Sequence, residues 1–363
     1  EPDIGFREKE LINECLDTGW ISSEGPFVNK FEVEMSKKVN RKYGIACSNG
    51  SAALDIAVRA LNIGPGDEVI MPTFTIISCA TAIINSGAKP ILVDADPETW
   101  NMQVENIEAL ITKNTVAIMA VHIYGLPVYL DPIIKIAEKY HLAIIEDSAE
   151  LIGGKYKNKP CGSFGTVSTF SFYSNKHITT GEGGMILTND FGLAERCKSL
   201  RNLCFKPNNR FVHDEIGWNY RMTNLQAALG IAQLEKLEKS IDKKLQIGEK
   251  YLKEIKNINL INTQQLKTDY AFNIFWVFGI LVDKDFSIAK SIIEELYKRK
   301  IGARPFFYPM HKQPVFNELG LFLNDHHPVS EDLYKQGLYL PSGLKLKNSD
   351  IEIVCKHLRS IFS

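Results

Sequence analysis

The sequence predicts an α/β protein in which a mostly parallel sheet is covered by helices on both faces. Between residues 43 and 200, short apolar segments alternate with segments of helical periodicity, the rhythm of strand–helix–strand units. The strand segment Val116-Ala-Ile-Met-Ala-Val121 is apolar without interruption, as expected where both faces of a sheet are buried. Ligands of such sheets bind beyond the carboxyl ends of the strands. We therefore expect the functional site among the residues that follow each strand.

Length, charge and cysteine content limit the classes of function. A chain of 363 residues, 45% hydrophobic and 23% charged, is expected to form one or two globular domains. The net charge of −1 gives no reason to expect nucleic acid or an acidic membrane as a partner. No apolar run reaches the roughly 20 residues that span a bilayer, and no signal pattern opens the chain. The seven scattered cysteines form no Cys-x-x-Cys pair, which predicts reduced thiols, a cytoplasmic protein and no metal site.

Hydrophobic periodicity gives the elements in chain order. Two amphipathic helices, at 8–16 and 27–39, precede the sheet and are separated by a turn at 19–26 that contains glycines. The apolar segments of strand length that follow are 43–47, 68–71, 90–93, 116–121, 142–146 and 185–188. The segments of helical periodicity between and after them are 51–61, 76–85, 104–111, 130–140 and 191–200.

The C-terminal third predicts a smaller α+β domain. One long helix is expected from residue 225 towards 255, and the charged residues of its later half indicate a solvated face. The remaining elements are strands at 275–282 and 302–307 and helices at 286–299 and 350–361. We therefore divide the chain into a large domain, 1–240, which includes the N-terminal helical segment, and a small domain, 241–363.

A lysine stands near the end of a further strand-like segment that begins at Ser168. Lys176 follows this segment and precedes the glycine-rich Gly181-Glu-Gly-Gly184. An ammonium group is costly to remove from water without a partner, so a lysine at the end of a buried strand suggests a Schiff base to an aldehyde cofactor. The glycines would let the backbone approach a flat ring. A loop lysine that points to solvent is the alternative.

Two other strand ends carry chemistry that suits the same cofactor. Ser48-Asn-Gly-Ser51 opens a helix, where free N–H groups and the positive end of the helix dipole favour a phosphate. A serine that only caps the helix is the alternative. Asp147 follows the strand at 142–146 and could pair with the protonated nitrogen of a pyridine ring. A capping aspartate or a structural ion pair is the alternative for this residue.

An anion cradle, a strand-end acid and a strand-end lysine on one sheet together predict a pyridoxal phosphate (PLP) site. No Gly-x-Gly-x-x-Gly follows a strand, so the dinucleotide fingerprint is missing. The phosphate loop Gly-x-x-x-x-Gly-Lys-[Ser/Thr] and the nucleophile elbow Gly-x-Ser-x-Gly are also absent from the sequence. In the small domain, Tyr308 and His311 flank a proline-rigid turn and are candidates for substrate contacts, although each alone is more often a packing residue.

Six segments that span nearly the whole chain resemble the DegT/DnrJ/EryC1/StrS family of sugar aminotransferases, within the fold-type I PLP enzymes. They are Trp20-Ile-Ser-Ser23, Ser48-Asn-Gly-Ser51, Met71-Pro-Thr-Phe-Thr75, Glu146-Asp-Ser-Ala-Glu150, 171–184 and Asn219-Tyr-Arg-Met-Thr-Asn224. The run from Asn175 to Gly184 is the most specific. Pro97-Glu-Thr-Trp-Asn101 and residues 217–226 are most similar to members that act on a GDP-linked sugar. The resemblance implies a large domain with a mixed, mostly parallel sheet between helices and a smaller α+β C-terminal domain.

The resemblance also implies roles for individual residues. Lys176 would hold the cofactor's aldehyde and Asp147 its ring nitrogen, while Gly50, Ser51 and Ser171 would bind its phosphate.

Four further expectations concern the ring, the subunit contact and the substrate. Glu150 would lie near the cofactor's phenolic oxygen. Asn219 would reach the phosphate of the neighbouring subunit's cofactor, which implies a homodimer with shared active sites. Ile76 occupies a position where many relatives place an aromatic residue over the ring, so stacking is expected to be weaker here. The residues expected to contact the substrate are Trp20, Ser22, Tyr308 and His311.

The implied reaction is amino transfer, because relatives that act as dehydratases carry histidine in place of Lys176. The amino group of L-glutamate would pass through the cofactor's pyridoxamine form (PMP) to C4 of a nucleotide-linked 4-keto-6-deoxyhexose. Such deoxyamino sugars serve lipopolysaccharide and O-antigen biosynthesis. A GDP-linked sugar is expected first, and a UDP- or dTDP-linked sugar with a viosamine-type product is the alternative. A non-catalytic regulatory protein with the same fold is the alternative from a different class.

Overall fold

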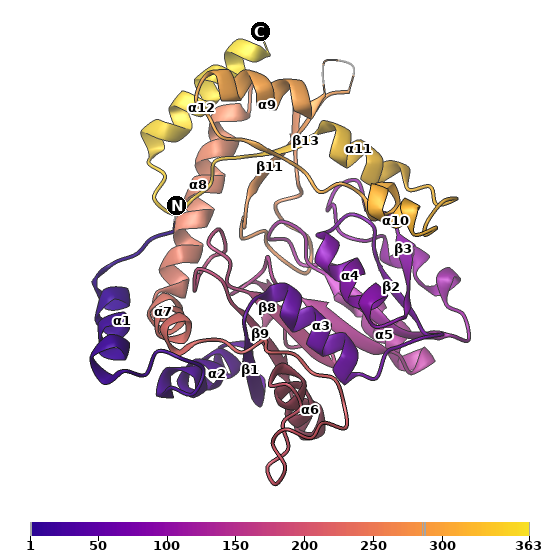
Figure 1. Cartoon of the computed structure of the whole chain (residues 1–363). Helices are drawn as coiled ribbons and strands as arrows, with labels where there is room; N and C mark the ends of the chain where they lie inside the picture. Colours follow the sequence, from indigo (N-terminus) through magenta and orange to yellow (C-terminus); the bar gives the residue numbers. More distant parts are fainter. Residues whose placement is uncertain (1, 285, 287, 363) are drawn as a thin grey trace.

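The computed structural model describes residues 2–284, 286 and 288–362 and contains two main sheets of unequal size (Figure 1). The larger sheet has seven strands in the order β1-β9-β8-β5-β4-β2-β3. They are β1 (Tyr43–Cys47), β2 (Glu68–Pro72), β3 (Lys89–Val93), β4 (Thr115–Val121), β5 (Ala143–Asp147), β8 (Val167–Ser171) and β9 (Gly184–Thr188). Only β9 runs antiparallel to its neighbours, β8 and β1. The predicted mixed, mostly parallel sheet is confirmed.

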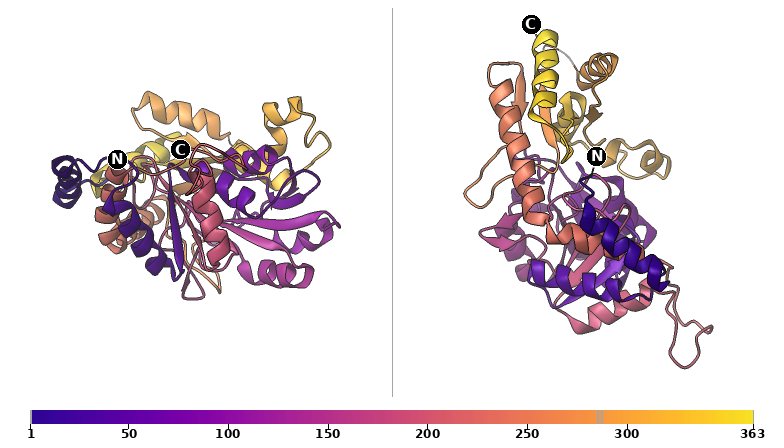
Figure 2. Two further views of the ribbon diagram at one scale, coloured as in Figure 1. Left: turned by 60° about the horizontal axis from the view of Figure 1, so that its bottom comes forward. Right: turned by 90° about the vertical axis from the view of Figure 1, so that its left-hand side faces the viewer.

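Helices cover both faces of the large sheet and form two separate apolar cores. One core contains α3 (Gly50–Ala60), α4 (Ile77–Asn85) and α6 (Phe191–Arg201). The other contains α1 (Phe6–Thr18), α2 (Pro26–Val39), α5 (Leu130–Tyr140) and α7 (Asn224–Glu235). Successive residues of β4, such as Ile118 and Met119, belong to opposite cores, as the alternation of side chains requires. Both faces are therefore buried, which explains the uninterrupted apolar run, and Figure 2 shows helices on either side of the sheet.

The smaller sheet lies in the C-terminal part of the chain and has its own core. Its order is β10-β11-β13-β12, all antiparallel, and its strands are β10 (Ile261–Thr263), β11 (Phe278–Val282), β12 (Arg304–Pro305) and β13 (Gly337–Leu340). The helices that share this core are α8 (Leu237–Ile255), α9 (Ala289–Lys298) and α12 (Asn348–Ile361). α8 runs from the large sheet's side of the molecule towards α12 (Figure 1). The domain division at residues 240 and 241 falls in the first turn of α8 and stays a prediction.

Several short elements connect the two sheets or lie beside them. They are the hairpin β6 (Lys155–Tyr156) and β7 (Lys159–Pro160), the 3₁₀ helix η3 (Met310–Lys312), α10 (Pro314–Glu318) and α11 (Pro328–Gln336). The last three lie between β12 and β13 but pack onto the large sheet's first core through Met310, Phe316 and Leu333. In the part of the chain that the structure describes, no helix combines the length and the apolarity needed to cross a membrane.

Two helices predicted from the sequence are built differently. The segment 104–111 forms two 3₁₀ helices, η1 (Val104–Asn106) and η2 (Glu108–Leu110), instead of one α-helix. Its buried side chains, Val104 and Ile107, are three residues apart, which suits the three residues per turn of a 3₁₀ helix. The helix expected from 225 to 255 is divided into α7 and α8 at Lys236, whose side chain forms an ion pair with the buried Glu8 at 2.6 Å.

Two expectations about the small domain also need adjustment. The charged half of α8 is not solvated throughout, because Lys244 is only 3% exposed. The helix expected at 286–299 is described from Ala289 onwards, and residue 287 of that expected range lies outside the described residues.

Candidate active site

A cavity of 530 Å³ lies at the carboxyl ends of the large sheet's strands. Its wall contains residues that follow β1 and β2, the last residues of β4 and β5, and the end of β8. The cavity therefore lies where the parallel topology predicts a ligand site. Of the residues expected to bind the cofactor, those that line it are Gly50, Ser51, Ile76, Asp147, Glu150, Ser171 and Lys176.

The first turn of α3 forms the anion-binding end of this cavity. Asn49, rather than a serine, caps the helix, and its side chain accepts a hydrogen bond from the amide of Ala52 at 2.8 Å. The amides before Ala52 have no acceptor within the helix and lie at the positive end of the helix dipole. The hydroxyls of Ser51 and Ser78 are 2.6 Å apart at the same place. These groups can surround a phosphate, as helix N-termini commonly do.

Gly50 is required by the close approach of α3 to β8. A Cβ at position 50 would lie 2.8 Å from the Cβ of Ser171, which is closer than two carbon atoms can pack. The absence of a side chain at Gly50 therefore brings the Ser171 hydroxyl next to the first turn of α3, where both were expected to contact the phosphate.

Asp147 is the last residue of β5, and this residue is 2% exposed. Oδ1 accepts hydrogen bonds from the amide of Ala149 (3.0 Å) and the hydroxyl of Thr169 (3.4 Å), and Oδ2 accepts one from the thiol of Cys79 (3.3 Å). No described helix starts at this point, so the residue is not a helix cap. Burial raises the pKa of Cys79 well above its usual value, so the thiol stays a donor. Oδ2 therefore keeps capacity for a second, stronger donor such as a pyridinium N–H.

Lys176 lies at the boundary between the large sheet and the small domain. Its Nζ is 3.8 Å from the centre of the Trp276 indole ring, and the indole N–H donates to the carbonyl of Asn175 at 3.1 Å. Burial lowers the pKa of Lys176, while the carboxylates of Glu150 and Asp147 oppose this shift. The side chain lines the cavity, which is the position expected of a lysine that binds an aldehyde rather than of one that extends into solvent.

Glu150 adds a buried carboxyl group to the same wall. Its Oε2 accepts a hydrogen bond from the amide of Tyr124 at 2.8 Å. Burial raises the pKa of Glu150 to about 8, with the Lys176 ammonium opposing that change. A carboxyl group that retains its proton near neutral pH can donate a hydrogen bond to an oxygen atom of a ligand.

The remaining predicted residues lie outside this cavity. Tyr308 packs its ring edge-on against Tyr334, with ring centres 4.6 Å apart. His311 is buried between the Thr73 hydroxyl (2.9 Å) and the Glu331 carboxylate (3.2 Å), as its packing interpretation suggests. The other three, Trp20, Ser22 and Asn219, are exposed on the surface of the single chain.

Several cavity residues were not identified from the sequence. Trp276 and Tyr339 come from the segment before β11 and from β13, and the exposed Tyr173 follows β8. These three residues and Phe307 give the cavity an aromatic surface. Ile76, which is 41% exposed, contributes only an aliphatic side chain. The Phe-Trp pair at 275–276 was visible in the sequence, but nothing in it indicated which side chain faces the large sheet.

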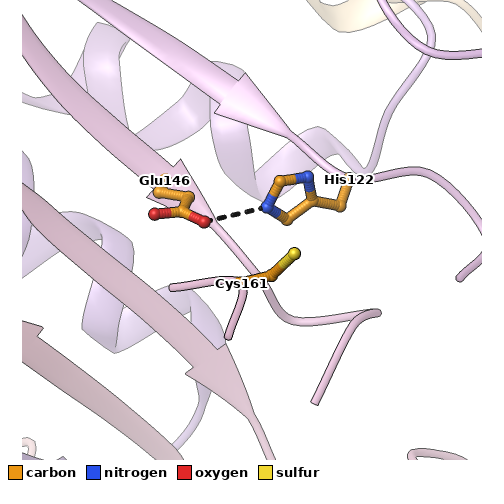
Figure 3. Close-up of side chains that lie close together, drawn as sticks. All are labelled: His122, Glu146 and Cys161. Atoms are coloured by element: carbon orange, nitrogen blue, oxygen red, sulfur yellow. Dashed lines mark hydrogen bonds and ion pairs between the residues drawn. The ribbon is translucent and has the colours of Figure 1, made fainter. Parts of the chain in front are cut away.

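A second cluster of potential ligand atoms lies behind β5 (Figure 3). His122, Glu146 and Cys161 are buried, and one possible ligand atom from each lies within 4.8 Å of the others. His122 Nε2 contacts Glu146 Oε1 at 3.1 Å, and Nδ1 accepts the amide of Val128 at 3.1 Å. Both ring nitrogens are therefore already in hydrogen bonds, and Glu146 also binds three backbone amides. This arrangement serves to hold the chain together and leaves no free imidazole lone pair for a metal.

The donor set of the large cavity fits pyridoxal phosphate. An amine, an anion-binding helix end and a buried carboxylate with a free lone pair lie on its wall, contributed by Lys176, the first turn of α3 and Asp147. Ile76 and Trp276 line the same cavity and would offer apolar surface to a cofactor ring. A Cβ at Gly50 would clash with Ser171, so glycine at this position lets the two phosphate-binding segments lie close together.

Comparison with known proteins agrees with this interpretation. Residues 2–359 match the DegT/DnrJ/EryC1/StrS aminotransferase family. The chain is 42% identical over 363 residues to the GDP-perosamine synthase of Escherichia coli O157:H7, covering 100% of this chain and 98% of that protein. It is 39% identical over 361 residues to the GDP-perosamine synthase of Caulobacter vibrioides, covering 99% and 96%. Among solved structures, Helicobacter pylori PseC, an aminotransferase involved in the biosynthesis of pseudoaminic acid, superposes with a TM-score of 0.93 at 25% identity, covering 100% and 98%.

Proposed function

The chain belongs to the DegT/DnrJ/EryC1/StrS aminotransferase family, and we propose that it is a PLP-dependent enzyme of the GDP-perosamine synthase type. The reaction would transfer the amino group of L-glutamate to C4 of a GDP-linked 4-keto-6-deoxyhexose, for use in surface polysaccharide such as O-antigen. The observation that carries this proposal is the convergence of Lys176, Asp147 and the Gly50–Ser51 cradle on one cavity of 530 Å³.

Each of these residues has a distinct task in the proposed reaction. Bound PLP supplies an electron-withdrawing ring that stabilises negative charge on the carbon that loses a proton. The Asp147 carboxylate keeps the ring nitrogen protonated, and Ser51 with Ser171 holds the phosphate. Lys176 binds the aldehyde and, once released as a neutral amine, carries the proton between the reacting carbons. Its lowered pKa favours that neutral form.

Glu150 completes the set by donating a hydrogen bond to the phenolic oxygen. The raised pKa of this carboxyl group keeps a proton available near neutral pH. Ile76 and Trp276, which line the same cavity, would pack against the cofactor.

We propose further that the active form is a homodimer in the cytoplasm. The segment between α6 and α7 extends away from the body of the molecule (Figures 1 and 2) and exposes Phe211 (80%) and Ile216 (81%). Asn219 lies in the same exposed region and would reach the neighbouring subunit's cofactor phosphate, and Trp20, Ser22, Tyr308 and His311 stay candidates for substrate contacts. All seven cysteines are free and buried, as suits a reducing compartment. Sedimentation of the purified protein would show a monomer if the proposed subunit contact is wrong.

The decisive experiment is an amino-transfer assay with GDP-, UDP- and dTDP-linked 4-keto-6-deoxyhexoses in parallel. We expect the GDP-linked sugar to react fastest, and Lys176→Ala to reduce turnover by at least about 1000-fold because it removes the group that binds the aldehyde and moves the proton. Lys113→Ala, at an exposed lysine, is the matched control and should retain full activity. Substantial turnover by the Lys176 variant would disprove the assigned role, and a wild-type protein inactive on all three sugars would favour a regulatory function.

A further inference from the structure

A second, smaller cavity lies on the far side of the Lys176–Trp276 pair. It measures 250 Å³ and shares Asn175, Lys176, Trp276 and Tyr339 with the candidate active site. The rest of its wall comes mainly from the small domain, including the turn that follows β13. Lys176 therefore borders two cavities, one that suits the cofactor and one that the proposed roles do not use.

Three basic residues and no acidic ones line this second cavity, among the residues that the structure describes. They are Lys244, Arg304 and Lys176, and the first two remain available to an anion when Lys176 holds the cofactor's aldehyde. The first cavity differs, because Asp147, Glu150 and Glu182 contribute to its wall. The second cavity is thus a concave surface with one sign of charge, which attracts an anion and strengthens its binding.

Lys244 is the unusual member of this set. Its Nζ donates to the carbonyls of Trp276 and Ser342, both at 2.7 Å, which leaves one of the three N–H groups for another acceptor. No carboxylate lies within 4.0 Å of that nitrogen in the described part of the chain. Burial lowers the pKa of Lys244 to about 7, and the nearby Lys176 adds to the shift. A buried ammonium without a counter-charge is costly, so a ligand that supplies the charge would be bound favourably.

Another lysine of α8 shows what an ordinary lysine does on this helix. Lys250 contacts the carboxylates of Glu254 at 3.0 Å and Glu352 at 2.6 Å on the surface. The sequence alone does not distinguish Lys244 from the other lysines of α8. In the structure, it is the only lysine of α8 that lines the cavity behind Lys176.

We propose that this second cavity binds the distal carboxylate of a dicarboxylate amino donor, with Lys244 and Arg304 as its cationic contacts. The inference rests on the proposed aminotransferase function. The donor's amino group must reach the carbon that Lys176 holds, so the rest of the donor begins at the residue that both cavities share. A cavity of this size is smaller than those that accept drug-sized ligands and suits the side chain of a small metabolite.

The test separates the two halves of the reaction. The donor half is followed by the loss of the cofactor's absorbance when glutamate or alanine is added to the PLP-loaded enzyme. The sugar half is followed by mixing the aminated enzyme with the 4-keto sugar. A charge-assisted hydrogen bond typically changes binding by 10- to 100-fold. We therefore expect Lys244→Met to raise the half-saturating glutamate concentration by roughly 10- to 100-fold and to leave alanine and the sugar half unchanged.

Two further variants keep the result interpretable. Arg304→Gln lies on an exposed position, so it should fold even if Lys244→Met does not, and should weaken glutamate selectively by a smaller factor. Lys250→Met is the matched control on the same helix and should behave as wild type. Binding of glutarate, an unreactive five-carbon dicarboxylate, is measured by calorimetry with butyrate as the monocarboxylate control. Both cavity variants should weaken glutarate and leave butyrate unchanged.

The possible outcomes decide between distinct explanations. Equal losses with glutamate and alanine would overturn the inference and assign Lys244 to structure alone. A selective loss in the sugar half would also overturn it, because the cavity would then hold the nucleotide's diphosphate. If the wild-type enzyme accepts glutamate and both variants keep the same preference for glutamate over alanine, the inference is rejected and the proposed function stays intact.

Discussion

Glu146 is a position where replacing a single oxygen atom should lower stability strongly. Its buried carboxylate accepts four hydrogen bonds, from His122 Nε2 (3.1 Å) and the Gly162 amide at Oε1, and from the amides of Phe164 and Gly165 (2.9 Å each) at Oε2. Glu146→Gln keeps the size of the side chain but converts one acceptor oxygen into a donating NH₂ group. The loop at 162–165, which these bonds hold against β5, should therefore lose part of its anchor.

Neither orientation of the glutamine amide restores the network. If NH₂ replaces Oε2, two backbone N–H groups lose their acceptor. If it replaces Oε1, it faces the Gly162 amide and the N–H of His122, and the imidazole cannot move its proton because Nδ1 accepts the Val128 amide. Each buried donor without an acceptor costs about 1–3 kcal/mol. Two such donors should lower the free energy of unfolding by roughly 2–6 kcal/mol, a large part of the 5–15 kcal/mol typical of a domain.

Urea unfolding monitored by fluorescence checks this magnitude. With a slope of about 3 kcal/mol per M, a loss of about 4 kcal/mol would shift the midpoint by roughly 1.3 M. Glu138→Gln, at an exposed position of α5, is the matched control and should change stability by less than about 0.5 kcal/mol. A midpoint for Glu146→Gln within the range of that control would show that packing, not the hydrogen bonds, holds the loop.

Two other substitutions test a strained backbone position, Gly125, and a buried neutral imidazole, His177. Gly125 has φ +100°, and a Cβ there would lie 2.6 Å from the Trp276 amide nitrogen, so Gly125→Ala should lower the free energy of unfolding by about 2 kcal/mol or more. Gly302→Ala, with open space around it, should leave the urea midpoint unchanged. Burial lowers the pKa of His177 to about 3, so the unfolded chain binds a proton below pH 6.5 that the folded state excludes. Stability should fall by about 2 kcal/mol between pH 6.5 and 5, and His177→Gln, which does not titrate, should lack that loss; identical pH profiles would contradict the assignment.

The large sheet and its strand ends were predictable because local pattern and topology agree there. The apolar run ending at Val121 is short and lies in a strand–helix rhythm, which favours a strand buried on both faces, and a parallel sheet brings the ends of its strands to one edge. Ser51, Asp147 and Lys176 are far apart in sequence, yet each follows such a strand, so their meeting in one cavity follows from the fold class. The finer roles came from resemblance to a family and could not be obtained from periodicity.

The small domain's share of the site could not be predicted for a physical reason. Trp276 and Tyr339 belong to the second sheet or its approach, and no sequence pattern states which of its side chains face the first sheet. Lys244 lies in a lysine-rich helix whose pattern indicates a solvated face, and only tertiary packing buries that one ammonium. The break between α7 and α8 at Lys236 was also missed, and the side chain of this residue forms an ion pair with Glu8, more than 200 residues away in sequence.

Basic side chains connect the candidate active site with the second cavity. Lys176 and Lys244 both have lowered pKa values because they are buried, and the first turn of α3 adds the positive end of a helix dipole. Burial raises the pKa of Glu150 to about 8, which weakens the negative charge that this carboxyl group contributes near neutral pH. Every proposed reactant is an anion: the cofactor through its phosphate, the donor through its carboxylates, the sugar through its diphosphate. Added salt should therefore weaken all three, whereas the loss of Lys244 should weaken only the dicarboxylate, which distinguishes a general field from a specific contact.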